Sequence, residues 1–297
     1  MSWRLRTVPH LLARSQLARR YAIAHDIPGL VFNGYGRAVG LRLLIARQPL
    51  GWAYLINPVS IVRYWEFEFV AAELPNGINR AADISSPRLF SFWYASRHPD
   101  LCIDLLNPDP DDSTASSVMA STLKQPRVVP ATKRIDELPM DVSYDAIWSI
   151  SVVEHISGAY DDTAAVRMMY DALRLGGHLI LTVPVDRSHR DEFRSSDPYG
   201  TQEESEGKGF FFQRFYDERT MFERLVRPLP AHDLVSIRWF GERRQGHFSS
   251  YESDWIERGL ARTVEDPREI ADHYREYQSW SEMPGMGVCG IHVVRAS

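Results

Sequence analysis

Cysteine is scarce in this chain of 297 residues, which contains only Cys102 and Cys289. Each lies inside an apolar run, so we expect two buried thiols rather than a disulfide framework or a metal site. Because disulfides persist mainly in oxidising compartments, this usage favours a reducing cytoplasm.

Long apolar stretches are also missing. The longest uncharged run near the N-terminus, residues 48–62, is shorter than the roughly 20 residues that span a bilayer, and it contains Pro49 and Pro58. The sequence therefore predicts no transmembrane helix. It also lacks the long apolar core of a secretory signal peptide, which disfavours secretion.

An overall excess of basic residues is absent, since 34 Lys and Arg stand against 39 Asp and Glu for a net charge of −5. This balance excludes the basic footprint of a nucleic-acid binder. The N-terminus differs, because its first 25 residues contain no acid and five arginines: Arg4, Arg6, Arg14, Arg19 and Arg20. This composition suits a membrane-surface helix, so residues 1–65 are a candidate for peripheral membrane contact.

What is present fits a globular α/β protein, with 44% hydrophobic and 25% charged residues. We expect a helix from Asn57-Pro58 to Leu74, closed by Pro75-Asn76-Gly77. Apolar strands and helices then alternate: strands at 80–84, 101–106, 126–131, 144–152 and 178–183, and helices at 89–97, 113–123 and 162–175. Continuous apolar strands separated by helices are typical of a parallel sheet covered on both faces.

The C-terminal third changes character. The pair Gly176-Gly177 is expected to cap the helix at 162–175. After it we expect a helix at 215–225 and two strands, 234–240 and 288–294, that add an antiparallel edge to the sheet.

Two segments carry a resemblance to a known family. The first reads Tyr144-Asp145-Ala146-Ile147-Trp148-Ser149-Ile150-Ser151-Val152-Val153-Glu154-His155-Ile156, and the second reads Ala172-Leu173-Arg174-Leu175-Gly176-Gly177-His178-Leu179-Ile180-Leu181-Thr182-Val183-Pro184. Together with Leu138-Pro139, they resemble the fourth and fifth strands of class I S-adenosylmethionine (SAM)-dependent methyltransferases, in particular the type 11-like members.

This resemblance implies a Rossmann-like α/β fold with a seven-stranded, mostly parallel sheet and an antiparallel C-terminal strand. It implies SAM as cofactor and a methyltransferase domain over residues 80–297 with an insertion at 241–287. Residues 1–79 would form an N-terminal helical extension.

The cofactor loop departs from the family. Where Asp-x-Gly-x-Gly is usual, this chain has Asp83-Ile84-Ser85-Ser86-Pro87. Serine is the next smallest side chain, so Asp83, Ser85 and Ser86 remain candidates for the cofactor site. A degenerate loop that no longer holds SAM is the alternative. A nicotinamide dehydrogenase is disfavoured, because no Gly-x-Gly-x-x-Gly follows the first strand.

Further cofactor contacts are expected where later strands end. Asp104 is the first candidate for the ribose hydroxyls and Asn107 the second, although Asp104 also suits a solvated strand end. Three residues at the end of the fourth strand are expected beside the methionine part of SAM: Ser149, Ile150 and Ser151.

The candidate catalytic residues are His155, His189 and Glu154, any of which could take a proton from a hydroxyl or amine acceptor. Each could instead be a solvated or bracing side chain. Residues 186–192 lack the paired spacing of metal ligands, so we assign no metal. The aromatic run at 210–216 favours core packing over a lid.

Polar and aromatic residues in the insertion at 241–287 suit a sugar or phenol, or a homodimer contact. The leading hypothesis is a SAM-dependent methyltransferase acting on a small-molecule or glycan acceptor, with oxygen as the expected acceptor atom. The alternatives are a catalytically silent scaffold with the same fold and an accessory protein that works at a membrane surface through residues 1–65.

Overall fold

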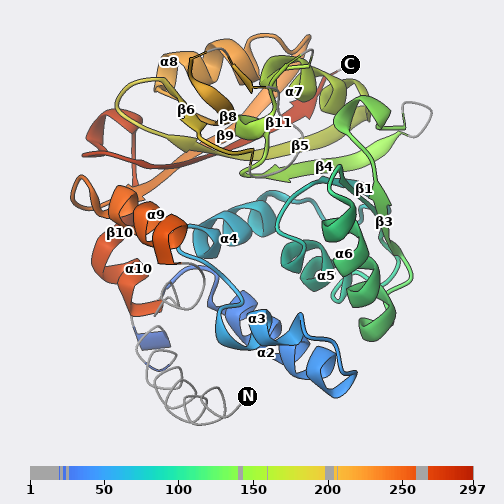
Figure 1. Ribbon diagram of the computed structural model, residues 1–297. Coiled ribbons are helices and arrows are strands. Elements are labelled where there is room, and N and C mark those ends of the chain that lie inside the picture. Colours follow the sequence, from blue (N-terminus) through green and yellow to red (C-terminus); the bar gives the residue numbers. More distant parts are fainter. Residues whose placement is uncertain are drawn as a thin grey trace.

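A sheet of eight strands forms the centre of the molecule (Figure 1). The structure is a computed structural model that describes residues 20, 23–24, 27–139, 143–158, 160–197, 204–205, 207–258 and 267–296. The strand order is β10-β9-β11-β5-β4-β1-β2-β3. The strands are β1 (Arg80–Ile84), β2 (Cys102–Asn107), β3 (Val128–Thr132), β4 (Tyr144–Ile150), β5 (Leu173–Val185), β9 (His232–Glu242), β10 (Tyr274–Tyr277) and β11 (Gly287–Arg295).

Strands β1 to β5 form the parallel part of the sheet. β1 lies between β4 and β2, with Asp83 opposite both Trp148 and Leu105. This confirms that the strand containing Asp83 is central and adjacent to the strand at 144–150. The fully buried residues of β1 and β4 face both sides of the sheet, which explains why these strands are mostly apolar.

The remaining strands form an antiparallel part. β11 pairs with β5 on one side and with β9 on the other, so the last strand lies inside the sheet. β10 pairs antiparallel with β9 and makes the sheet one strand larger than expected. In β10 (Tyr274–Tyr277) the two tyrosines are buried and the two charged residues between them are exposed. This pattern is too short to be recognised in the sequence.

Helices cover both faces of the sheet. One face carries α4 (Arg63–Glu73), α5 (Leu89–Ala95) and α6 (Pro110–Leu123), and the other carries α7 (Asp162–Asp171) and α8 (Glu218–Met221) (Figure 1). Two apolar cores result, one containing Phe67, Phe90 and Trp148, the other containing Ile147 and Met169. Trp148 and Ile147 are neighbours in β4 and point to opposite faces, as strand geometry requires.

The N-terminal region forms α2 (Leu30–Ile45) and α3 (Gly51–Ile56) ahead of α4. The expected helix start at Asn57-Pro58 is wrong, because Asn57 caps the end of α3 through its backbone N–H, which donates to Ala53 O at 2.8 Å. α4 begins only at Arg63, since the buried residues Val59, Ile61 and Val62 pack as an irregular segment. None of the helices in the described ranges is long and apolar enough to cross a membrane.

Two further boundaries differ from expectation. α7 ends at Asp171 rather than Leu175, because Leu173 already pairs with Tyr144 as the first residue of β5. Gly176 has φ 71° and lies within the irregular start of β5 instead of capping the helix. The left-handed conformation explains why glycine suits this position.

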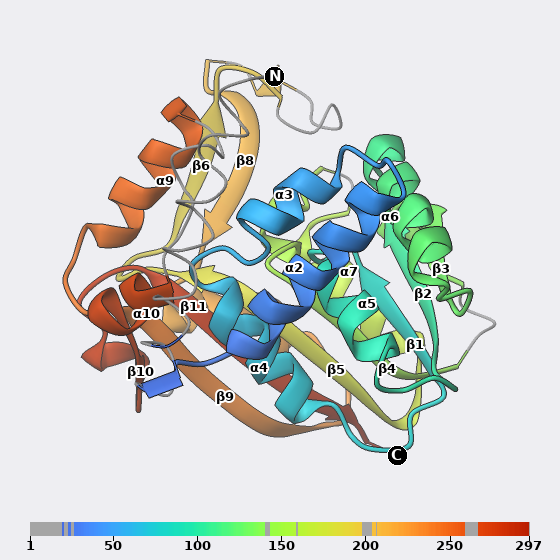
Figure 2. The same ribbon diagram turned by 90° about the horizontal axis from the view of Figure 1, so that it is seen from below.

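A second, smaller sheet follows β5 along the chain. It consists of β6 (Arg190–Arg194), β8 (Gly209–Phe215) and β7 (Glu204–Ser205), all antiparallel, and it contains the aromatic run (Figure 2). The expected helix at 215–225 is therefore shorter. Phe215 ends β8, and helix α8 starts after Asp217, whose side chain accepts from Thr220 N at 2.7 Å. The insertion at 241–287 contains α9 (His247–Arg258), α10 (Pro267–His273) and β10.

Candidate active site

A cavity of about 690 Å³ lies at the carboxyl ends of the parallel strands. The loops after β1, β2 and β4 line one side of it, and residues 57–63 of the N-terminal region line another. Phe212 of β8 and Tyr251 of α9 complete the wall. Ligands of open α/β sheets bind at this edge, and cavities of this size hold small-molecule ligands.

The loop after β1 brings Ser85 and Ser86 to the cavity. Ser85 has φ 55°, and both its N–H and its hydroxyl donate to Leu106 O, at 2.7 and 3.0 Å. The left-handed backbone explains why glycine is favoured in such a loop and why only a small side chain suits it. Ser86 is buried, and its Oγ accepts from Ile150 N at 2.9 Å, which ties the loop to β4.

Asp83 lies beneath this loop and does not line the cavity. Its fully buried carboxylate accepts from Ser86 N at 2.9 Å and from the Ser91 hydroxyl. Burial raises the pKa of Asp83. In the structure this predicted cofactor residue therefore fixes the shape of the loop from behind and does not face the cavity.

The end of β2 presents Asn107 to the cavity and not Asp104. Asp104 lies in mid-strand, where Arg80 pairs with its carboxylate and the Tyr144 hydroxyl donates to it at 2.8 Å. It is too early in β2 to reach the edge where the ribose contact was expected. The Asn107 side chain accepts from Asp109 N at 2.9 Å and donates to Asp112 at 2.7 Å.

Of the three residues expected at the end of β4, only Ser151 lines the cavity. Ser149 is buried, and its hydroxyl donates to Ile84 O at 3.3 Å. Ile150 is buried too and contributes its N–H to the Ser86 contact. Ser151 has φ 47°, so the chain turns sharply there, and its N–H donates to Thr182 O at 2.9 Å.

A buried glutamate that the sequence did not single out holds this turn. Glu66 of α4 has no exposed surface, and its Oε1 accepts from Ser151 Oγ at 2.5 Å and from Thr182 Oγ1 at 2.7 Å. Arg63, one helical turn earlier, pairs with the other oxygen and lines the cavity. The i, i+3 spacing of Arg63 and Glu66 was visible in the sequence, but their partners on β4 and β5 were not.

Glu154 and His155 follow in the 3-10 turn after β4, and both line the cavity. Glu154 is 2% exposed, its Oε2 has no hydrogen-bond partner among the described residues, and burial raises its pKa to about 8. Its Oε1 lies 3.9 Å from His155 Nε2. A buried carboxyl oxygen left unsatisfied beside a cavity is costly in a fold, which marks Glu154 as a functional candidate.

His155 has the opposite protonation preference. Burial lowers its pKa to about 4, so the ring is neutral at neutral pH. Its Nδ1 lies 2.6 Å from Phe212 O. Since a carbonyl oxygen only accepts, Nδ1 carries the proton and Nε2 carries the lone pair. The turn after β4 therefore places a protonated carboxyl and an unprotonated imidazole nitrogen beside the same cavity.

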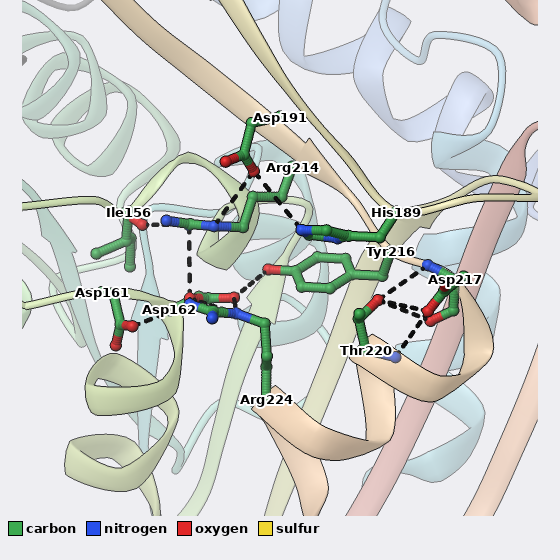
Figure 3. A network of polar contacts seen from close by, with 10 residues as sticks. All are labelled: Ile156, Asp161, Asp162, His189, Asp191, Arg214, Tyr216, Asp217, Thr220 and Arg224. Carbon is green, nitrogen blue, oxygen red and sulfur yellow. Dashed lines mark hydrogen bonds and ion pairs between the residues drawn. The ribbon is translucent and has the colours of Figure 1, made fainter. Parts of the chain in front are cut away.

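His189, the third catalytic candidate, is exposed and does not line the cavity. It lies over the Tyr216 ring, with Nε2 at 3.9 Å from Asp191 (Figure 3). Among the residues that the structure describes, no three His, Cys, Asp or Glu side chains form a group that could hold a metal ion.

The network in Figure 3 braces the loop that contains Glu154 and His155. Arg214 of β8 donates to Ile156 O at 2.6 Å and lies 3.5 Å from the buried carboxylate of Asp162. Asp162 also accepts from the Tyr216 hydroxyl at 2.7 Å and pairs with Arg224. The small sheet thereby anchors the C-terminal end of the 3-10 turn, where Phe212 O contacts His155 and Arg214 donates to Ile156 O.

No model of a known protein family matches the chain, and no curated protein matches it. Solved structures do. The O-methyltransferase from the trans-AT PKS multienzyme of Brevibacillus brevis, in complex with S-adenosyl-L-homocysteine, is similar with a TM-score of 0.53 at 11% identity, over 86% of this chain and 79% of that chain.

Two other solved structures have a TM-score of 0.50. Coclaurine N-methyltransferase bound to N-methylheliamine and SAH is 12% identical over 75% of this chain and 67% of its own. The [4+2]-cyclase SpnF is 14% identical over 90% and 96%. At such low identity the similarity shows the fold alone: this chain has the Rossmann-like fold of class I SAM-dependent methyltransferases.

Proposed function

We propose that this chain is a SAM-dependent methyltransferase that transfers a methyl group to an oxygen atom of a small-molecule or glycan acceptor. The observation that carries the proposal is the cavity at the carboxyl ends of β1 and β4, with its left-handed serine loop and the Glu154–His155 pair beside it. Structural neighbours that contain S-adenosyl-L-homocysteine support the choice of cofactor.

The residues around the cavity fit SAM in kind. Ser85 and Ser86 offer a small-residue loop against which a ligand can lie, and Asn107 has an amide at the place where the ribose is expected. Ser151 lies where the methionine part is expected, and Arg63, which pairs with the same Glu66 as Ser151, supplies a cation that suits the methionine carboxylate. We propose these residues, in place of Asp83, Asp104, Ser149 and Ile150, as the direct cofactor contacts.

Bound SAM supplies an electrophilic methyl group on a sulfonium. The chain has to orient the acceptor and, for a hydroxyl, to take its proton. His155 Nε2 is the unprotonated nitrogen beside the cavity at neutral pH, so we assign it the proton-accepting role. Glu154 carries its proton at the same pH and donates a hydrogen bond to the acceptor. His189 has no role in this proposal.

A second candidate function is a silent scaffold with the same fold. The loss of Asp-x-Gly-x-Gly favours it, and the cyclase neighbour illustrates that this fold is compatible with other chemistry. Three points stay predictions. They are a homodimer contact through residues 241–287, membership of the type 11-like subclass and a domain boundary at residue 80.

One titration separates the two functions. We expect S-adenosyl-L-homocysteine to raise the melting temperature of the full chain, because a ligand that binds only the native state stabilises by about 2.7 kcal/mol at a hundred-fold excess over Kd. Asn107→Ala should weaken binding by about 1–2 kcal/mol if it contacts the ribose. Asp104→Ala is the matched control and should leave binding intact. If millimolar ligand does not raise the melting temperature of the wild type, the methyltransferase hypothesis is excluded and the scaffold is favoured.

A further inference from the structure

The outer face of α2 is apolar and exposed. Leu41 is 54% and Ile45 75% exposed on this helix, and Val31 is 48% exposed near its start. Together with Gly34 and Ala38 they recur every three to four residues, so they form one continuous stripe, which we call the α2 stripe. Of the nine large apolar side chains that are exposed in the described ranges, these three share one helix face.

The opposite face of α2 is already committed to packing. Phe32, Val39 and Leu43 are buried in the core, and Gly36 and Gly40 contact Pro58 and α3 so closely that a Cβ on either would clash. A contiguous apolar patch on a protein surface normally marks an interaction site. Among the residues that the structure describes, α2 is instead the outermost layer over α4 and α5, as the view from below shows (Figure 2).

Charge indicates what covers the stripe. Residues 1–65 contain nine arginines and Asp26 as the only acid, while the remaining residues contain 25 basic and 38 acidic side chains. The N-terminal region is thus strongly cationic in a chain whose net charge is −5. Arg42 and Arg47 are exposed beside Ile45, and the Arg42 guanidinium also reaches Leu123 O at 3.4 Å.

Other occupants fit less well. A second copy docked stripe against stripe would bring two cationic regions together, with no acid between Asp26 and Glu66 to neutralise them. The first 19 residues of the chain are themselves basic. Nucleic acid would complement the arginines but would leave the apolar stripe facing phosphates.

We propose that the α2 stripe docks on an anionic membrane surface, with Val31, Leu41 and Ile45 entering the interface and Arg42 and Arg47 meeting lipid phosphates. An apolar face flanked by arginines is the arrangement by which interfacial helices bind anionic lipid. Because residues 57–63 follow α3 and line the cavity, docking would place the candidate active site next to the membrane. The inference does not depend on the proposed methyl transfer.

The test is co-sedimentation of the full chain with phosphatidylcholine vesicles, with and without phosphatidylglycerol. We expect binding only to the anionic vesicles, weakening with salt. The double variant Arg42→Gln, Arg47→Gln should lower the partition coefficient about 30-fold, because each arginine near the lipid surface contributes a factor of about five. Leu41→Glu with Ile45→Glu should lower binding at least ten-fold. Leu175→Glu with Val235→Glu, at positions 60% and 52% exposed elsewhere, is the matched control and should bind like the wild type.

Circular dichroism and melting curves show that each variant is folded. Equal binding to neutral vesicles, or unchanged binding of the Leu41→Glu, Ile45→Glu variant, would overturn the proposal. So would a dimer in solution that this variant dissociates, which would make a second copy the occupant. If the chain binds duplex DNA and does not bind vesicles, the partner of the α2 stripe is nucleic acid and not a membrane.

Discussion

Ser85 adopts a left-handed backbone conformation although it is not a glycine. The φ of 55° is the conformation for which glycine is usually selected, and here the Ser85 hydroxyl bonds to Leu106 O. The position of this loop was predictable, because it follows the first strand and ends in small residues. Its stabilisation was not, since Leu106 belongs to a different strand.

We predict opposite effects for two substitutions of Ser85. Ser85→Gly should keep binding of S-adenosyl-L-homocysteine, because glycine adopts the left-handed backbone readily and leaves the cavity open. Ser85→Leu should abolish binding by filling the cavity, and should lower the free energy of unfolding by about 1 kcal/mol through loss of the hydroxyl bond. Calorimetric titration and melting curves measure both. Retained binding in Ser85→Leu would remove the loop from the cofactor site.

Glu154 predicts how stability depends on pH. Its pKa is about 8 in the folded chain and near 4.5 when unfolded, so the folded state keeps a proton that the unfolded state releases. The resulting stabilisation is complete below pH 4.5 and is lost as the pH rises through 8. The loss amounts to at most about 1.4 kcal/mol per pH unit between the two values.

Glu154→Gln removes this dependence. The variant should therefore gain stability relative to the wild type as the pH rises from 5 toward 8, which chemical denaturation at several pH values would measure. Glu282→Gln, at an exposed glutamate, is the control and should follow the wild type. A pH-independent difference between Glu154→Gln and the wild type would mean that the carboxyl is ionised in the folded chain.

Among the predicted elements, α4 was placed with the wrong start. Its start was placed at Asn57-Pro58 because this pair is a common helix start, yet the buried segment before Arg63 overrides the local preference. Strands β1, β2 and β4 were predicted closely because apolar runs mark them. Partners 85 and 116 residues apart, such as Glu66 with Ser151 and Thr182, leave no local signal.

We predict that Glu66→Ala lowers the free energy of unfolding by about 3 kcal/mol, because it leaves Arg63 without its ion-pair partner and two hydroxyls without an acceptor. For a chain of 297 residues the melting temperature should fall by roughly 5 °C. Glu66→Gln is the matched variant: it keeps an acceptor for Ser151 and should lose clearly less. Equal losses in both would assign the whole effect to the charge pair.

On the scale of the whole molecule, the two halves of the sheet were not equally predictable from the sequence. The parallel half follows from alternation of strands and helices, and the pairing of β1 with β4 was predicted. The small sheet was missed, because its aromatic strand β8 reads as core and its partner strand β6 is rich in charge. That sheet supplies Phe212 O and Arg214, so the bracing of the candidate active site could not be predicted either.

The position of β11 has a consequence for synthesis. Its neighbours β5 and β9 are both made earlier, yet they are joined only through residues 287–295. Until this segment leaves the ribosome, two long strands present open edges that can pair with other chains. Translation that stops before Gly287 would therefore yield a product prone to aggregation, although every residue lining the cavity except Val288 would already be present.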